Sequence, residues 1–308
     1  MAFATDLAAQ RKDLAARLGR VGVWTFALDR TSASEAREFV AAVEEMGFRA
    51  LWIPEGLGSK EAFVHAAVLL AAGRSLVVAT GIASIWARDP VAMANGARAL
   101  EDAFPGRFVL GMGVSHEFSV SRRGHEYRQP YRRMVAYLKA MEEARYTGPN
   151  KQGWPPIVLA ALGPRMLRLA AERTAGAHPY FVPVEHTEFA RRTMGPGPLL
   201  LPEQAAVLET DPGRARAVAR AFMEHYLELP NYANNLRRLG WKEEDLAGGG
   251  SDRLVDAIVA WGDVEAVRAR VRAHLDAGAD HVSVQVLTED PRRLPTPELR
   301  ELAPALVE

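Results

Sequence analysis

Short apolar runs alternate with longer amphipathic stretches along most of this chain. The run over residues 76–82, LVVATGI, is rich in β-branched residues and contains Thr80 and Gly81 near its end, before the polar and aromatic turn ASIWARDP. A parallel strand that is buried on both faces has this composition. Asp89 and Pro90 then fit the cap and the first turn of a helix. The stretch therefore predicts a strand, a turn and a helix in succession.

The same unit recurs along the chain. Ser32 and Glu35 fit a capping box, and Gly47 fits the end of the helix that they begin. We expect strands over residues 20–29, 50–53, 76–82, 107–114, 156–160, 176–181, 199–208 and 281–287, with helical patterns between them. A longer helical region, interrupted by three glycines at 248–250, separates the seventh strand from the eighth.

Eight such units without a linker-like break in composition predict an α/β fold, a TIM (β/α)8 barrel that forms a single domain over residues 1–308. Residues 1–18 would add an N-terminal helical extension, and residues 211–262 a helical insertion between strands 7 and 8. The alternative is an open doubly wound sheet. It lacks its nucleotide fingerprint, because His116 stands where the third glycine would follow Gly111 and Gly113.

Composition narrows the class of protein. The chain has 308 residues, 48% of them hydrophobic, and its 38 basic residues balance its 38 acidic ones, so no global field favours nucleic acid or an acidic membrane. Cysteine is absent, which excludes disulfides and thiolate sites. The first residues lack a signal-peptide pattern, and no run approaches the ~18 apolar residues that cross a bilayer. We expect a soluble cytoplasmic protein.

Several familiar catalytic motifs are missing from the sequence. It contains no HExxH pair, no GxSxG elbow and no P-loop, so hydrolysis by those routes is not expected. In a barrel, the residues that follow each strand form the working face. Here these residues are mostly apolar and aromatic, which suits an organic cofactor better than a metal.

The turn at residues 161–165, ALGPR, offers an anion site. Gly163 lets the backbone approach a ligand closely, and Pro164 begins a helix whose first amides are free to bind an anion. Arg165 in the first helical turn opposes the helix dipole unless a negative group lies nearby. The alternative is an ordinary turn with Arg165 in solvent.

Other side chains at the ends of strands each have two readings. His116 is an acid or base suited to neutral pH, or a loop cap. Glu55 binds substrate or cofactor edges, or pairs with a neighbouring loop. Trp24 and Trp86 sandwich a ring, or belong to the core. A set of arginines after the fourth strand forms a solvated face or an anion-binding lid: Arg122, Arg123, Arg128, Arg132 and Arg133.

Taken together, these strand ends resemble the luciferase-like monooxygenase superfamily, and within it the oxidoreductases that use the deazaflavin coenzyme F420. The resemblance covers nearly the whole chain. It rests on ATGIxxIWARDPxxMA at 79–94, RFVLGMGVSH at 107–116, GPRMLRLAAERTAGAHPYF at 163–181, LPNYANNLRRLGW at 229–241 and AHLDAGADHVSVQVL at 273–287.

The resemblance implies a role for several positions. A non-proline cis peptide would fall between Gly81 and Ile82, where relatives support the deazaflavin ring, and His116 would be the catalytic proton donor or acceptor. The cofactor-binding residues would be Trp24, Glu55, Gly81, Ile82, Ala83, Gly113, Val114, Ser115, Leu162, Gly163, Pro164, Arg165 and Tyr180, with the phosphate at 162–165 and a further contact near Tyr180.

Two departures from the family pattern bear on these contacts. Many relatives have an Asp-His pair where this chain has Pro54 and Glu55, and others have a second glycine where it has Leu162. The bulkier Leu162 would narrow the phosphate pocket or move the phosphate.

The resemblance implies an F420-dependent oxidoreductase that transfers hydride between the deazaflavin and an alcohol, a carbonyl compound or an activated alkene. One alternative keeps the fold but binds FMN, as a two-component monooxygenase. Another is a cofactor-binding protein without turnover. We expect a small-molecule substrate and a homodimer, and neither a metal site nor a nucleic-acid or membrane partner.

Overall fold

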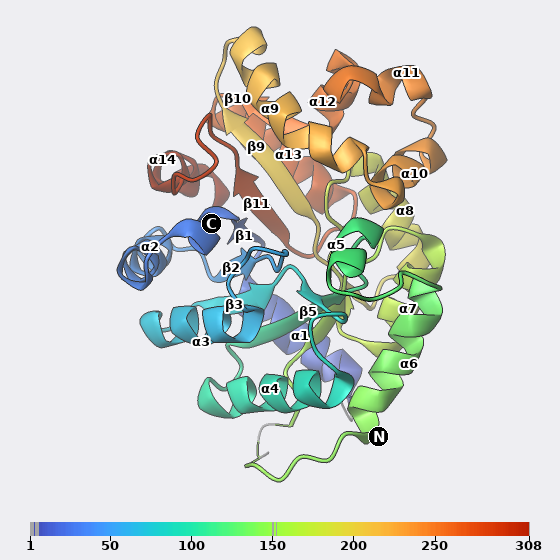
Figure 1. Cartoon of the computed structure of the whole chain (residues 1–308). Helices are drawn as coiled ribbons and strands as arrows, with labels where there is room; N and C mark the ends of the chain where they lie inside the picture. Colours follow the sequence, from blue (N-terminus) through green and yellow to red (C-terminus); the bar gives the residue numbers. More distant parts are fainter. Residues whose placement is uncertain (1–2, 4–5, 150, 152, 308) are drawn as a thin grey trace.

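The computed structural model of the chain describes residues 3, 6–149, 151 and 153–307. Parallel strands curl around a common interior, and helices cover their outer side (Figure 1). The strands are β1 (Val21–Trp24), β2 (Ala50–Ile53), β3 (Val77–Thr80), β4 (Ala83–Ser84), β5 (Phe108–Gly113), β6 (Ile157–Leu159), β7 (Gly176–Ala177), β8 (Leu199–Leu200), β9 (Glu203–Leu208), β10 (Val259–Gly262) and β11 (Val282–Val286).

The ring closes through one segment that contacts two neighbours. β8 pairs with β7 through Gly176 and Leu199, whereas β9, which follows after two residues, pairs with β11 through Ser283 and Glu203. The remaining order is β11, β1, β2, β3, β5, β6, β7, all parallel. This is the TIM-type barrel that the alternation of strands and helices predicted, with the expected seventh strand divided at Pro202.

The helices are α1 (Leu7–Leu18), α2 (Ala33–Glu45), α3 (Ala62–Ala72), α4 (Pro90–Ala103), α5 (Glu117–Arg122), α6 (Pro130–Glu143), α7 (Pro164–Arg173), α8 (Val184–Met194), α9 (Pro212–Leu227), α10 (Pro230–Arg238), α11 (Glu243–Leu246), α12 (Asp252–Ile258), α13 (Val264–Asp276) and α14 (Thr296–Leu306). The capping box of Ser32 and Glu35 and the cap at Asp89 are confirmed. Within the described ranges, no helix has the length and apolar character needed to cross a membrane.

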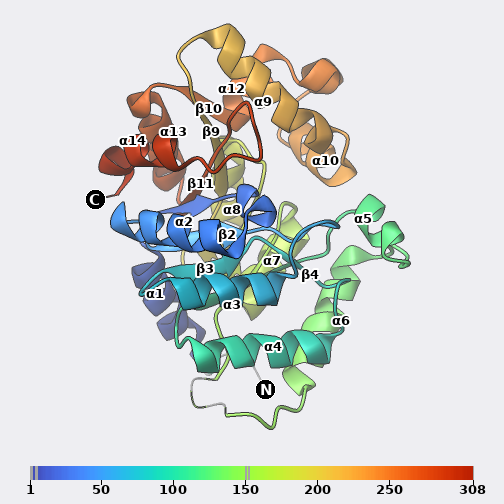
Figure 2. The same ribbon diagram turned by 60° about the vertical axis from the view of Figure 1, so that its left-hand side comes forward.

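The prediction of a helical insertion over residues 211–262 is wrong for its last four residues. Residues 259–262 form β10, which pairs in parallel with the outer side of β9 from Val259–Ala205 to Gly262–Leu208. The apolar residues 259–262 continue the helical pattern of α12, so the local sequence does not predict a strand there. Their conformation is decided by pairing with the edge of β9, about 50 residues earlier in the chain. Helices α9 to α12 project from one end of the molecule (Figure 2).

One end of the barrel is filled by the helix that precedes it. Leu14 and Leu18 of α1 are buried in the same cluster as Ala50, Val77 and Leu199, which are the first residues of β2, β3 and β8. The amino-terminal ends of the strands are therefore covered, and the carboxyl ends remain for a ligand.

Close strand contact also limits the sequence within the barrel. A Cβ atom at Gly111 would lie 1.8 Å from the carbonyl oxygen of Thr80, and the Thr80 hydroxyl donates to the Gly111 carbonyl at 2.7 Å. Only glycine fits here, because the obstructing atom belongs to the backbone of the neighbouring segment.

Candidate functional site

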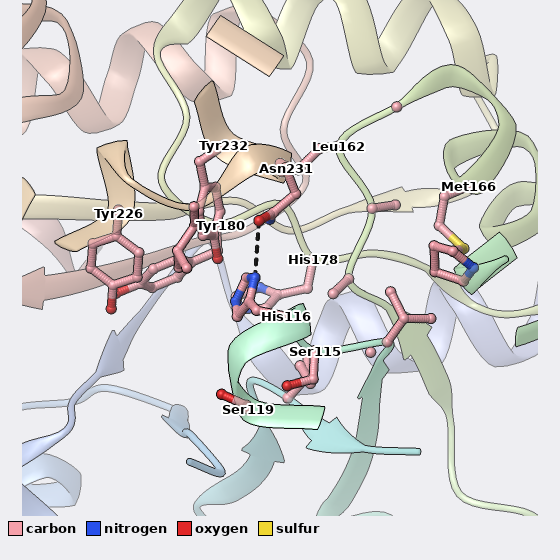
Figure 3. Close-up of a pocket in the computed structure, with 18 of the residues that line it drawn as sticks. Ser115, His116, Ser119, Leu162, Met166, His178, Tyr180, Tyr226, Asn231 and Tyr232 are labelled. Atoms are coloured by element: carbon pink, nitrogen blue, oxygen red, sulfur yellow. Dashed lines mark hydrogen bonds between the residues drawn. The ribbon is translucent and has the colours of Figure 1, made fainter. Parts of the chain in front are cut away.

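A cavity of about 700 Å³ opens at the carboxyl ends of the strands. Its walls come from the ends of β1, β2, β3 and β5, from the turns that follow β6 and β7, and from helices α9 and α10 of the insertion. This volume is typical of sites for cofactors and drug-sized molecules. Figure 3 shows part of its lining, with His116 near the centre.

The structure brings almost all predicted site residues into this one cavity. Those that line it are Trp24, Glu55, Gly81, Ile82, Gly113, Val114, Ser115, His116, Leu162, Gly163, Pro164, Arg165 and Tyr180. Ala83 does not line it, because it is fully buried in β4, opposite Met112. Trp86, proposed as a second ring contact, donates its Nε1–H to the Val114 carbonyl at 2.8 Å and lies outside the lining.

The floor of the cavity lies where β3 breaks off. The peptide bond between Gly81 and Ile82 is cis, as predicted. A Cβ atom at Gly81 would lie 2.6 Å from Trp24 Nε1 and 3.0 Å from His178 Nε2, so the backbone passes directly over these two rings. The Ile82 side chain in turn covers Gly113, where a Cβ atom would lie 2.6 Å from Ile82 Cδ1.

Two buried nitrogen atoms under this floor have no hydrogen-bond partner among the described residues. They are Trp24 Nε1, a donor, and His178 Nε2. The Leu201 carbonyl lies 2.6 Å from His178 Nδ1, so Nδ1 carries the proton, and burial lowers the pKa of His178 to about 4. His178 Nε2 is therefore an acceptor near neutral pH. Buried polar atoms without partners are rare and costly, and these two lie directly against the Gly81 backbone that forms the floor.

The Glu55 carboxylate is already engaged within the protein. It accepts hydrogen bonds from the Ser84 amide at 2.7 Å and from both terminal nitrogens of Arg88, which also pairs with Glu61. Of the two roles considered for Glu55, ligand binding and pairing with a neighbouring loop, the structure shows the pairing. Glu55 lines the cavity, but its carboxylate oxygens hold the turn after β4.

His116 lies at the N-cap position of α5, where β5 delivers it to the cavity. It does not cap that helix through its side chain. Its Nδ1 lies 2.9 Å from Asn231 Oδ1, and its ring is 5.4 Å from that of Tyr232. Burial lowers the pKa of His116, only partly offset by the contact with Asn231. The imidazole is therefore neutral near pH 7, which suits a base.

The turn after β6 forms another part of the cavity wall. Gly163 is the N-cap of α7 and offers no side-chain cap, so the first amides of this helix are free to meet an anion. Arg238 of α10 approaches the turn, with Nη2 3.7 Å from the position of a Cβ atom at Gly163. The Arg165 guanidinium lies over the Tyr131 ring at 4.2 Å. Two cations thus stand at this turn.

Tyrosines form a further wall. The Tyr180 hydroxyl forms hydrogen bonds with the Tyr226 hydroxyl at 3.0 Å and with Gln285 Oε1 at 2.9 Å. The Tyr226 and Tyr232 rings are 5.4 Å apart. Figure 3 shows these tyrosines on one side of His116, and Leu162 and Met166 on the other. The hydroxyl of Tyr180, predicted as a phosphate contact, is thus occupied. Burial raises its pKa, so it stays protonated.

The arginines of the connection after β5 do not reach the cavity. Arg133 lies over the Trp86 ring at 5.0 Å, Arg122 over Phe118 at 4.5 Å, and Arg123 donates to the Gly56 carbonyl at 3.3 Å. None of the five arginines belongs to the lining. They pack around α5 and the loop that follows it, as a loop face rather than as a lid that binds an anion.

Three functional candidates were missed from the sequence. His178 lies within the expected sixth strand, two positions before Tyr180, and Asn231 and Arg238 lie in the insertion. The signal for His178 was its inward position at the end of β7. Asn231 and Arg238 lie within the matched stretch LPNYANNLRRLGW, but only the packing of α10 over the barrel brings them to the cavity.

Comparison with known proteins supports a single family. A family model described as luciferase-like monooxygenase matches residues 16–281. A Mycobacterium tuberculosis protein, named provisionally as a coenzyme F420-dependent oxidoreductase, is 25% identical over 315 residues, which cover 82% of this chain and 89% of that protein. Two curated 5,10-methylenetetrahydromethanopterin reductases match over 46% and 47% of their length, so the chain spans about half of these relatives.

Solved structures share the fold at low sequence identity. The coenzyme F420-dependent tetrahydromethanopterin reductase from Methanopyrus kandleri superposes with a TM-score of 0.76 and 15% identity, covering 94% of this chain and 99% of that one. The oxygenating constituent of 3,6-diketocamphane monooxygenase from Pseudomonas putida, in complex with FMN, gives a TM-score of 0.65 and 14% identity, covering 92% and 95%.

Proposed function

Because this chain belongs to the luciferase-like monooxygenase family, we propose that it is a coenzyme F420-dependent oxidoreductase that acts on a small organic substrate. The observation that carries the proposal is the combination, in one cavity, of a floor formed at the cis peptide of Gly81 and Ile82 and a helix N-terminus with free amides beside Arg238. F420 has both a flat ring and a phosphate. The relative of similar length named for F420 use supports the same cofactor.

The residues of this chain fit the parts of such a cofactor. Gly81 and Ile82 would support the ring above the Trp24 and His178 side chains. The amides after Gly163, with Arg238, would bind the phosphate. When bound, F420 would supply the carbon that takes up or releases hydride.

The protein itself would position the substrate and handle the proton. His116, neutral and at the centre of the cavity, would hold or accept the proton that accompanies hydride transfer. The substrate, an alcohol, a carbonyl compound or an activated alkene, would lie against the tyrosine wall. That wall offers a substrate rings and neutral hydroxyls, and the Glu55 carboxylate, elsewhere in the lining, is already engaged by Ser84 and Arg88.

FMN is the second candidate cofactor, since an FMN-bound monooxygenase shares the fold. Two assays, an anaerobic one with F420 and an aerobic one with reduced FMN, separate the two functions. Mixed with oxidised F420 and a panel of secondary alcohols, the protein should bleach the visible absorbance of F420, and mixed with reduced F420 it should reduce the matching ketones. Absence of both reactions, with oxygenated product formed from reduced FMN and air, would contradict the proposal.

A further inference from the structure

We infer that Asn231 is a positioning residue that holds His116 as its Nδ1–H tautomer, so that Nε2 serves as the base and the substrate enters as a hydroxyl donor, an alcohol. The inference rests on the proposed function for its substrate. The contact itself belongs to the protein alone, and it joins two elements that are 115 residues apart.

The direction of the hydrogen bond follows from the chemistry of its two atoms. An amide oxygen can only accept, so at 2.9 Å from Asn231 Oδ1 the His116 Nδ1 must donate. A neutral imidazole has a single N–H, and burial keeps this one neutral near pH 7. Nε2 is then left with its lone pair, and it has no hydrogen-bond partner among the residues that the structure describes.

The position of Asn231 is set by the backbone of its helix. It is the second residue of α10, directly after Pro230. The next two residues, Tyr232 and Ala233, both donate their amides to the Leu229 carbonyl at 3.1 Å. The Tyr232 ring also lies beside the imidazole. The amide oxygen is thus presented from a fixed turn, which is what a positioning residue requires.

The other groups that face His116 leave it as a neutral base. His225 of α9 lowers its pKa further, and the Tyr232 hydroxyl stays protonated because burial raises its pKa. Glu117, the next residue along the chain, is exposed, and no carboxylate bonds to the imidazole in the described residues. An uncharged partner orients the ring and stabilises the imidazolium less than an aspartate at the same place would.

A neutral Nε2 acceptor selects a donor. An alcohol hydroxyl would donate to Nε2 and pass its proton there, while the carbinol carbon gives up hydride to the oxidised cofactor and a carbonyl product remains. Protons and electrons balance, because the alcohol loses one proton and one hydride. A ketone or an activated alkene would meet a lone pair instead of a donor, so alcohol oxidation matches the resting state of His116.

Nitrogen NMR of the imidazole tests the positioning role without cofactor. In protein with 15N-labelled histidine, the His116 signals, assigned by their loss in His116→Gln, should show the Nδ1–H tautomer. Asn231→Leu, which keeps the volume but removes the acceptor, should shift the population toward Nε2–H. Asn231→Asp should raise the His116 titration midpoint by about one pH unit or more. Glu224→Gln, exposed on α9, is the matched control and should change neither.

The Nε2–H tautomer in the unmodified protein, or an unchanged tautomer and midpoint in both variants, would overturn the positioning role.

Kinetics with F420 then test whether the substrate is an alcohol. Asn231→Leu should lower kcat for alcohol oxidation about tenfold with little change in KM, and Asn231→Asp should move the acid limb of the pH profile upward with its midpoint. Two results together would overturn the alcohol assignment. They are a faster rate of ketone reduction than of alcohol oxidation at neutral pH, and no acid limb in the pH profile of alcohol oxidation. If F420 supports no turnover while the NMR result holds, the proposed function fails and the positioning role stands.

Discussion

Substituting His116 by glutamine lowers kcat about 10²- to 10⁴-fold, the usual contribution of a positioned acid or base. Glutamine keeps a polar group that can bond to Asn231, but it cannot exchange a proton near neutral pH. The F420 dissociation constant should stay within about threefold, since the floor and the anion-binding turn are untouched. Stopped-flow reduction of F420 by an alcohol measures the first quantity, and fluorescence quenching measures the second.

His125 offers the matched control for this experiment. It lies on the connection after α5, is exposed and does not line the cavity. His125→Gln should therefore leave kcat unchanged. If His116→Gln turned over at the rate of His125→Gln, the protein would use another proton carrier, and the central role given to His116 would be wrong.

The second large effect comes from a substitution that should favour the fold while it blocks the cofactor. Gly163 is the N-cap of α7 with extended backbone, φ −91° and ψ 158°, and no side-chain cap. A Cβ atom there meets nothing closer than Arg238 at 3.7 Å. Gly163→Asp should thus cap the helix and stabilise the protein by a few tenths of a kcal/mol. The same carboxylate would occupy the expected phosphate position and raise the F420 dissociation constant about 100-fold, roughly 2.7 kcal/mol.

Gly163→Asn separates charge from shape. Asparagine caps a helix about as well as aspartate but adds no charge, so it should weaken F420 binding much less. Thermal unfolding of the apo protein and titration with F420 give the two readouts. Equal weakening by both variants would mean that bulk alone matters, and unchanged binding in Gly163→Asp would remove the phosphate from this turn.

Local signals were enough for much of the fold. β2 occupies the residues expected for it, 50–53, and the caps at Ser32 and Asp89 are as predicted, because such features depend on neighbours within one turn. Residues 259–262 were misassigned because their pairing partner, β9, is far away in sequence. The helix α14 was not predicted at all.

The residues of the candidate site also divide into those that local sequence predicts and those that depend on distant packing. Residues at the ends of strands were identified because barrel topology brings such positions together, and the cis peptide at Gly81 followed from family resemblance. Asn231 and Arg238 depend on how the insertion folds over the barrel, which no local pattern specifies. For Glu55, sequence alone could not show that Arg88 would occupy its carboxylate. The homodimer and the single-domain organisation stay predictions.

The most direct measurement of the central claim is the affinity of the purified apo protein for each cofactor. F420 and FMN are titrated in parallel, anaerobically, with quenching of cofactor fluorescence as the readout and Gly163→Asp as the control for binding at the phosphate turn. We expect F420 to bind at least tenfold more tightly than FMN, about 1.4 kcal/mol or more, and to lose that affinity in Gly163→Asp. Tighter binding of FMN than of F420 would contradict the assignment.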